Sequence, residues 1–375
     1  MNKTNFSVKK ITILLLIMLM TTSLMPLAIG APLPPQSTNA IEKTISPYNQ
    51  DTEYYAIIAA CTDYHNDKYN IPKKPAPPIP EYKLKFLYNS LLEAENWHQE
   101  NIMLLLNENA SRQHILNAFD QMADIVGPDD IFLFCWSGHG SQVLDDDGDE
   151  QLYDPEDSYD EIICPYDIEV VDGEPTNFIR DDEIDNALSE IQAKGMCLIF
   201  ESCLSGGLVD KTKTTTERSS YNNVESLDIN AENRVVIMST LPDTLGRASF
   251  LTGFPLLTSL ALAFKGYAQD RNRDGVLSIE EAFRTARYLE IMQSSVMYGF
   301  IWMYTYIIYK HEMHKESGSI INILFGQYPA FSATLLTLYS FIQLQMFSKI
   351  FNGHYILNWP NMRDDYQGEL PIMTQ

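Results

Sequence analysis

Two glycine-flanked turns carry side chains that could act together in catalysis. His139 follows the apolar run Ile131–Trp136, and Cys203 follows the apolar run Met196–Phe200. Both runs have the β-branched and aromatic composition of buried strands. In open α/β sheets, reactive groups collect at the carboxyl ends of the strands, and neighbouring strands lie about 4.8 Å apart. We therefore expect His139 to act as the base for a Cys203 nucleophile, the alternative being that both are ordinary turn residues.

Strands and helices are expected to alternate around these turns. Further short apolar runs predict strands, and amphipathic spacing predicts helices between them. This alternation implies an α/β fold with a mainly parallel sheet flanked by helices on both faces. The additional strands are expected at residues 54–60, 102–106, 161–164 and 235–239, and the helices at 84–97, 111–125 (with Ser111 as N-cap), 182–193, 256–268 and 279–289.

Composition narrows the choice of partners. The chain has 375 residues, enough for one large domain with an appendage, and a formal net charge of -24. Such acidity disfavours nucleic acid and anionic membrane surfaces, and it suits cationic substrates and divalent cations. The five cysteines are odd in number, and Cys61, Cys135 and Cys197 fall within apolar runs. We interpret these three as small core residues rather than as parts of a disulfide framework.

The N-terminus predicts export. Residues 1–30 combine a basic start, an apolar stretch and a small-residue cleavage site, as signal peptides do. The alternative is an uncleaved anchor. In either case the rest of the chain is expected to be exported, secreted or held at the cell surface. Residues 31–50 contain prolines and serines and predict a flexible linker.

Residues 270–281 fit the pattern of an EF-hand calcium loop throughout. Oxygen donors stand at each ligand position, a glycine stands where the loop turns sharply, and helix-like segments flank it. The alternative is a degenerate loop that holds its shape without metal. The expected ligands are Asp270, Asn272, Asp274, the Val276 carbonyl, Ser278 (often through water) and bidentate Glu281.

Four motifs in sequence order resemble those of the caspase-like cysteine peptidases, within them the metacaspase branch. Ser137–Gln142 resembles the family's histidine motif, and Glu201–Gly206 resembles its cysteine motif. Residues 145–167 resemble its acidic loop and following strand, and residues 179–183 its next motif. The resemblance implies a caspase-like fold for a peptidase domain at residues 51–289. With the signal peptide and the EF-hand-like loop, it points to a prokaryotic exported form.

The resemblance also implies the chemistry of the site. His139 would activate the Cys203 thiol, an acyl-enzyme would form, and the backbone N–H groups of Gly140 and Cys203 would stabilise the oxyanion. Metacaspases typically cleave after Arg or Lys. Glu201 stands where the family usually has an aspartate, and an anionic side chain there could pair with a basic P1 residue. Analogy with metacaspases favours a monomer.

A second calcium site is implied by the same resemblance. Calcium-dependent metacaspases bind the activating ion through aspartates near the catalytic centre. Four converging carboxylates would repel one another without a cation. The alternative is that these residues are scattered surface acids. The matching positions are Asp167, Asp181, Asp182 and Asp210.

The polar stretch after Asp210 suggests self-cleavage. Family analogy places autoprocessing in such a loop, and Lys211, Lys213 and Arg218 are the basic candidates. A plain surface loop is the alternative.

Residues 290–350 form an apolar helical segment. Two stretches, 291–309 and 320–347, contain no charged residue, and each is long enough to cross a hydrocarbon core. They predict a two-span membrane hairpin, or alternatively a pair of core or oligomer-interface helices. Residues 351–375 would form a C-terminal tail that packs on the peptidase domain.

Together these features predict a calcium-regulated cysteine endopeptidase that acts on peptides or proteins with a basic P1 residue. We expect no nucleic-acid partner, and we expect membrane contact through the apolar segment. One alternative is a catalytically inactive caspase-like scaffold that binds calcium. Another is a thiol transferase or hydrolase acting on non-peptide acyl groups.

Overall fold

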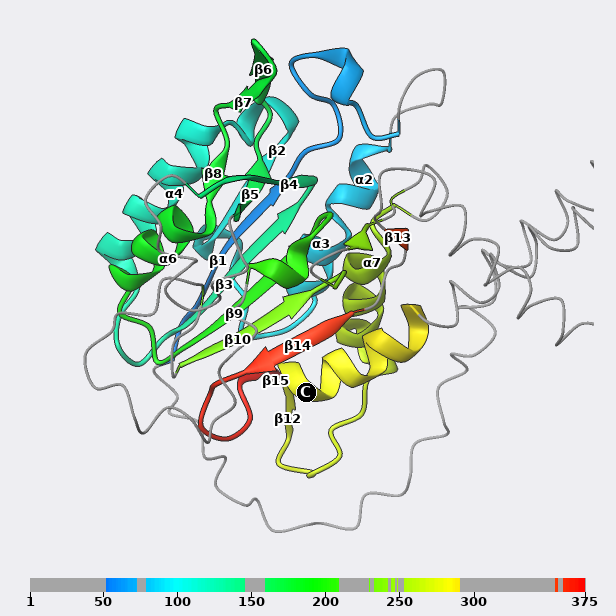
Figure 1. Cartoon of the computed structure of the whole chain (residues 1–375). Helices are drawn as coiled ribbons and strands as arrows, with labels where there is room; N and C mark the ends of the chain where they lie inside the picture. Colours follow the sequence, from blue (N-terminus) through cyan, green and yellow to red (C-terminus); the bar gives the residue numbers. More distant parts are fainter. Residues whose placement is uncertain are drawn as a thin grey trace, which may run out of the picture. The chain divides into compact units, whose positions relative to one another are not determined.

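A computed structural model describes most of the chain between residues 52 and 374 (Figure 1). The described residues belong to one compact unit, Tyr48–Gln375. The predicted signal peptide, linker and membrane hairpin lie outside them, as do Asp210, Lys211, Lys213 and Arg218. The described residues are 52–72, 79–145, 159–208, 229, 233–241, 244–246, 248, 253–290, 355–356 and 360–374.

The centre of the fold is a six-stranded sheet whose strand order is β14-β10-β9-β3-β1-β2. Five neighbouring strands are parallel, and β14 joins the edge antiparallel to β10. The predicted α/β class and mainly parallel sheet are therefore confirmed. The strands are β1 (Tyr54–Ala60), β2 (Ile102–Leu106), β3 (Ile131–Ser137), β9 (Gly195–Glu201), β10 (Arg234–Met238) and β14 (Asn361–Asp364).

Alternating side chains of this sheet form two cores. On β3, Leu133 and Cys135 face the core that also contains α3 and α7, whereas Phe132 and Phe134 face the core of α4 and α6. Figure 1 shows these helix pairs on opposite sides of the sheet. The helices are α2 (Glu81–Leu84), α3 (Phe86–Leu91), α4 (Arg112–Ile125), α6 (Asp181–Ser189) and α7 (Pro255–Leu262), and residues 279–290 are also helical.

The helix predicted at residues 84–97 is wrong in extent. The helical backbone is divided between α2 and α3 and ends by Leu92. The N-cap of α4 is as predicted, since the Ser111 hydroxyl accepts the His114 N–H at 3.4 Å. The short helical turns are η1 (Asp67–Tyr69), η2 (Gln99–Asn101), η3 (Asn107–Asn109), η4 (Ser205–Gly207) and η5 (Ala263–Tyr267).

Smaller sheets surround the central one. A three-stranded antiparallel sheet, β4-β5-β8, begins at His139, so this histidine opens a strand immediately after a bend at Gly138. The remaining strands pair as β6 with β7, β11 with β13, and β12 with β15. Their bounds are β4 (His139–Leu144), β5 (Tyr159–Cys164), β6 (Glu169–Val171), β7 (Glu174–Thr176), β8 (Ile179–Arg180), β11 (Thr244–Leu245), β12 (Val276–Ser278), β13 (Tyr355–Ile356) and β15 (Pro371–Thr374).

Among the described residues, every helix is too short or too polar to cross a bilayer. The stretches 291–309 and 320–347 lie outside that part of the chain.

Candidate active site

The two candidate catalytic turns leave the sheet from adjacent strands at the same level. Strands β3 and β9 are parallel neighbours, and their registers pair Ser137 with Glu201. Just beyond this pair, the Gly138 N–H donates to the Glu201 carbonyl at 3.3 Å. The expected adjacency of the two strands is therefore confirmed, because they are parallel neighbours that end side by side.

Glycines allow the two turns to approach closely. A Cβ on Gly140 would overlap the Cys203 carbonyl oxygen and would lie 2.9 Å from Ser202 Cβ. A Cβ on Gly138 would lie 2.6 Å from the Trp136 ring. A side chain at Gly140 would therefore prevent the backbone contact between β4 and the cysteine turn, and a side chain at Gly138 would collide with the Trp136 ring.

The backbone beyond β1 orients the His139 ring. Nε2 of His139 lies 2.8 Å from the Tyr69 carbonyl oxygen. A carbonyl oxygen only accepts, so this hydrogen bond requires the proton on Nε2 and makes Nδ1 the basic nitrogen. The Tyr64 hydroxyl accepts the His139 backbone N–H at 2.7 Å, and the two rings lie 5.1 Å apart. Neither tyrosine was predicted from the sequence, because both act through folding of the segment after β1.

Cys203 is the one cysteine of the five that is not fully buried. Its Sγ lies 4.0 Å from the Gly246 carbonyl oxygen, and Leu204 follows in the left-handed region at φ 59°. Burial raises the pKa of the Cys203 thiol, which favours the protonated form. A base is then needed to produce the nucleophilic thiolate.

Cys164 lies beside the same centre. It pairs with His139 across β4 and β5. Burial, with a smaller contribution from the neighbouring Cys203, raises the pKa of Cys164 to about 12. Burial also raises the pKa values of Cys61, Cys135 and Cys197. These last three behave as the predicted core residues.

Glu201, the predicted S1 residue, lies buried at the end of β9. Its two carboxylate oxygens accept the backbone N–H groups of Leu256 at 2.8 Å and Leu257 at 2.7 Å. These donors belong to the first turn of α7, so Glu201 caps that helix. Burial raises the pKa of Glu201, and the nearby Glu290 raises it further. Only 3% of Glu201 is exposed, so protein encloses its carboxylate in this structure.

The aspartates of the second predicted calcium site lie in two settings. Asp181 and Asp182 begin α6, and the Asp182 N–H donates to Asp181 Oδ1 at 3.2 Å. Asp167 instead accepts the Arg112 N–H at 2.8 Å at the start of α4. Asp210 lies outside the described residues.

A buried acid missed by sequence reasoning lies near the segment that leads to Asp210. Glu161 accepts Gln142 Nε2 at 2.8 Å, and its carboxylate packs where a Cβ on Gly207 would stand. Within the described ranges, no three His, Cys, Asp or Glu side chains are grouped as metal ligands.

The EF-hand-like loop is closed by its own backbone amides. Asp270 accepts the Gly275 N–H at 2.9 Å, Asp274 accepts the Val276 N–H at 2.9 Å, and Glu281 accepts the Arg271 N–H at 2.6 Å. Gly275 has a φ of 87°, as a sharp turn requires. The donor atoms at the ligand positions are all oxygens, the type that calcium prefers, but the carboxylates of Asp270, Asp274 and Glu281 are not grouped as metal ligands in this structure.

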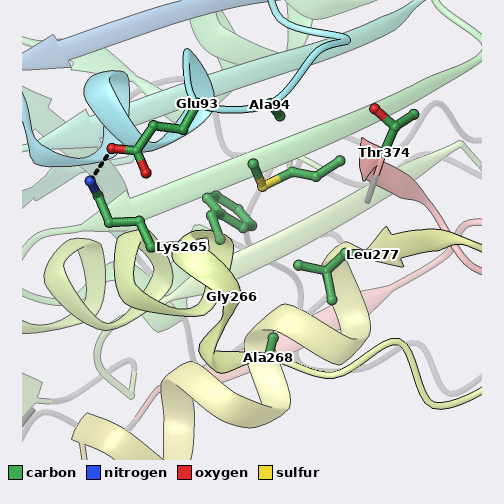
Figure 2. Close-up of a pocket in the computed structure, with 9 residues that line it drawn as sticks. Glu93, Ala94, Lys265, Gly266, Ala268, Leu277 and Thr374 are labelled. Carbon is green, nitrogen blue, oxygen red and sulfur yellow. Dashed lines mark hydrogen bonds and ion pairs between the residues drawn. The ribbon is translucent and has the colours of Figure 1, made fainter. Parts of the chain in front are cut away.

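A cavity of about 350 Å³ lies away from these groups, between η5, β12 and β15 (Figure 2). A Lys265–Glu93 ion pair stands at its side. None of the candidate catalytic residues lines it. The lining residues are Glu93, Ala94, Phe264, Lys265, Gly266, Ala268, Leu277, Met373 and Thr374.

Comparison with known proteins shows what the part of the chain that carries this site is similar to. Residues 83–212 match the family described as "Metacaspase, peptidase C14 domain", a family of cysteine-type endopeptidases. The matched stretch contains both His139 and Cys203. The resemblance inferred from the four motifs is therefore confirmed for this part of the chain.

Individual relatives carry the same name. Metacaspase-1 of Candida albicans is 32% identical over 127 residues, which are 32% of this chain and 27% of that protein. Metacaspase-1B of Neurospora crassa is 34% identical over 128 residues, 32% of this chain and 28% of that protein. The chain thus matches about a quarter of the length of these relatives. Caspase-1 from Spodoptera frugiperda superposes with a TM-score of 0.43 at 10% identity, covering 91% of this chain and 98% of that structure.

Proposed function

We propose that the protein is a cysteine endopeptidase in which Cys203 is the nucleophile and His139 the base. One observation carries the proposal: the paired ends of β3 and β9 bring the two turns into contact, with Gly140 packed on the Cys203 carbonyl. The family match supports the same chemistry.

The proposed reaction uses the groups described above. Nδ1 of His139 takes the thiol proton, and the thiolate attacks the peptide carbonyl carbon to form a tetrahedral oxyanion. The N–H groups of Gly140 and Cys203 donate to this oxyanion, and such donors contribute about 3–4 kcal/mol each. His139 protonates the departing amine. Water then hydrolyses the acyl-enzyme and restores the thiol.

We propose cleavage after Arg or Lys, with Glu201 as the anionic partner of the P1 side chain. Its place at the end of β9, two residues before the nucleophile, and the net charge of -24 support this preference. A buried carboxylate that keeps lone pairs available can accept a guanidinium in a charge-assisted pair.

Calcium is proposed to regulate the enzyme. The oxygen ligand set of residues 270–281 supports one site, and the family resemblance supports a second at Asp167, Asp181, Asp182 and Asp210. When bound, the ion would neutralise acidic side chains and rigidify the loops that hold them. Self-cleavage after Lys211, Lys213 or Arg218 is proposed on the same family analogy.

Export and membrane contact are proposed from sequence alone. The N-terminal pattern of residues 1–30 supports secretion or display at the cell surface, and the uncharged stretches 291–309 and 320–347 support membrane contact. Mass spectrometry of protein made in a secreting host tests the first point. Recovery of Ala31 as the first residue supports cleavage, and an intact Met1 contradicts it.

Fluorogenic peptides ending in Arg or in Asp, with and without calcium, test the catalytic proposal. Full-length protein in detergent should cleave after Arg, and Cys203→Ala should abolish the activity. Cleavage after Asp would overturn the role given to Glu201. Lack of turnover in protein that binds calcium would favour the non-catalytic scaffold.

A further inference from the structure

Two buried hydroxyl groups lie beside the nucleophile turn, at the end of the strand next to β9. Strands β9 and β10 are parallel neighbours whose register ends with Met238 beside Phe200. Ser239 and Thr240 follow directly, and both are fully buried. The Ser239 N–H donates to the Phe200 carbonyl at 3.0 Å, which holds this segment against the end of β9. The end of β10 therefore reaches the same edge of the sheet as the turn that carries Cys203.

Both hydroxyls donate to one carbonyl. Ser239 Oγ lies 3.3 Å and Thr240 Oγ1 lies 3.2 Å from the Ser202 carbonyl oxygen. That carbonyl belongs to the peptide unit that joins Ser202 to Cys203, so the N–H of the same unit is the Cys203 N–H. This peptide bond is trans, and the C=O and N–H of a trans peptide point in opposite directions within one plane. Fixing the carbonyl therefore fixes the direction in which the Cys203 N–H points.

Thr240 also binds the far side of the turn. Its Oγ1 accepts the Ser205 N–H at 3.0 Å, and its N–H donates to Ser205 Oγ at 3.2 Å. Because Oγ1 gives its single proton to Ser202, the Ser205 hydroxyl, 3.1 Å away, must be the donor to Oγ1. One side chain thus holds the residues on both sides of Cys203 and Leu204. Leu204 has a φ of 59°, a conformation that a non-glycine residue keeps only where its surroundings impose it.

The Cys203 N–H lies close enough to its own sulfur to act on it as a hydrogen-bond donor. Burial raises the pKa of the Cys203 thiol, and this N–H partly offsets that effect. In the proposed tetrahedral intermediate, the substrate carbon is bonded to the same sulfur, so the oxyanion forms within reach of the N–H. Hydrogen bonds in series polarise one another, and the two hydroxyls on the Ser202 carbonyl therefore make the Cys203 N–H a stronger donor.

We propose that Ser239 and Thr240 are positioning residues for the oxyanion site, because their hydroxyls hold the Ser202 carbonyl so that the Cys203 N–H points at the developing oxyanion. This inference rests on the proposed function, since it requires acyl transfer at Cys203. The two residues act through the peptide plane and need no contact with the substrate. Reactions of the thiol that form no oxyanion do not depend on them.

Two reactions of Cys203 separate this role from a general structural one. Hydrolysis of an Arg peptide passes through an oxyanion, whereas iodoacetamide alkylates the sulfur with loss of iodide and forms none. In full-length protein in detergent, Thr240→Val should lower kcat by about 10- to 100-fold, because a misdirected donor loses less than a missing one, which costs about 100-fold or more. The KM and the rate of Cys203 alkylation should stay near the wild-type values. Equal losses in hydrolysis and alkylation would overturn the positioning role.

Further variants provide rescue, a milder test and a control. Thr240→Ser keeps the hydroxyl and should restore kcat. Ser239→Ala removes one of the two donors to the carbonyl and leaves the Ser205 bonds intact, so it tests the role even if Thr240→Val does not fold. It should lower kcat without slowing alkylation. Ser90→Ala removes an equally buried hydroxyl, which donates to the Leu87 carbonyl at 2.7 Å within α3, and should leave both reactions unchanged.

Wild-type protein distinguishes failure of the proposed function from failure of the positioning role. If wild type does not hydrolyse the Arg peptide although iodoacetamide modifies Cys203, the proposed function is refuted, and this role with it. If wild type hydrolyses the peptide and Ser239→Ala and Thr240→Val do so with the same kcat, only the positioning role is refuted.

Discussion

At the scale of single residues, the Cys203 thiol and the His139 ring are prepared by different contacts. The Tyr69 carbonyl accepts the Nε2 proton of His139 and leaves Nδ1 as the basic nitrogen, whereas burial raises the pKa of the Cys203 thiol. If His139 is the base, we expect the thiolate to form by proton transfer during the reaction and not to persist as a stable anion. This distinction has a measurable pH dependence.

The alkylation rate of Cys203 should keep rising with pH beyond 9. Its pKa is raised above the ordinary value of 9.0 by burial, so the reactive thiolate fraction grows until the higher pKa is passed. The rate is measured by mass spectrometry of the iodoacetamide-modified peptide between pH 6 and about 10. A plateau at or below pH 7 would instead indicate a preformed thiolate–imidazolium pair.

Gly140→Ala should reduce kcat/KM by about 100-fold or more, because the new Cβ would overlap the Cys203 carbonyl and displace an oxyanion donor. Steady-state kinetics with an Arg peptide measures the loss. Ser141→Ala, at the exposed neighbouring position of β4, provides the control and should retain activity. If Gly140→Ala retained near-normal kinetics, the backbone around Cys203 could move to accommodate the new Cβ without affecting the reaction.

At the scale of elements, one carboxylate joins β9 to α7. Glu201→Ala would leave the Leu256 and Leu257 amides without their acceptor and should cost about 2–4 kcal/mol of unfolding free energy. Denaturant unfolding measures this cost. Glu93→Ala breaks only the surface pair with Lys265 and should cost under about 1 kcal/mol.

The Glu201→Ala variant also distinguishes the helix-capping role of Glu201 from its proposed role in substrate specificity. If Glu201 also pairs with P1, the surviving Glu201→Ala enzyme should lose its preference for Arg over neutral peptides, measured as a ratio of kcat/KM values. An unchanged ratio would restrict Glu201 to its structural role.

The sequence predicted those strands and helices whose residues show hydrophobic periodicity. Apolar runs located β1, β3, β9 and β10, and the motifs at the ends of β3 and β9 predicted that the turns carrying His139 and Cys203 leave the sheet side by side. Strand β4 was missed because Gly140 and its polar neighbours carry no alternating pattern, and pairing with β5 creates the strand. The cap on α7 was missed because Glu201 and Leu256 lie 55 residues apart. Contacts of such sequence separation exist only after the chain has folded.

At the scale of the whole molecule, the C-terminal residues 360–374, called the tail below, are expected to contribute strongly to stability. Ile372 is fully buried, and its carbonyl accepts Trp97 Nε1 at 2.7 Å. Ile372→Ala should lower the unfolding free energy by about 2–5 kcal/mol. Ile125→Ala removes the same atoms from an exposed site on α4 and should change it by less than about 0.5 kcal/mol. Equal effects of the two substitutions would contradict the packing role of the tail.

The antiparallel strand β14 also protects the central sheet from edge-to-edge aggregation. It covers β10, whose five residues, Arg234–Met238, are all buried and mostly apolar. When the tail undocks, β10 becomes an open strand edge, which can template pairing with other chains. Arg363 and Asp364 place charge on the outer strand and discourage such pairing while the tail is docked. Loss of the tail should therefore cause concentration-dependent aggregation through the exposed edge of β10, before the central sheet unfolds.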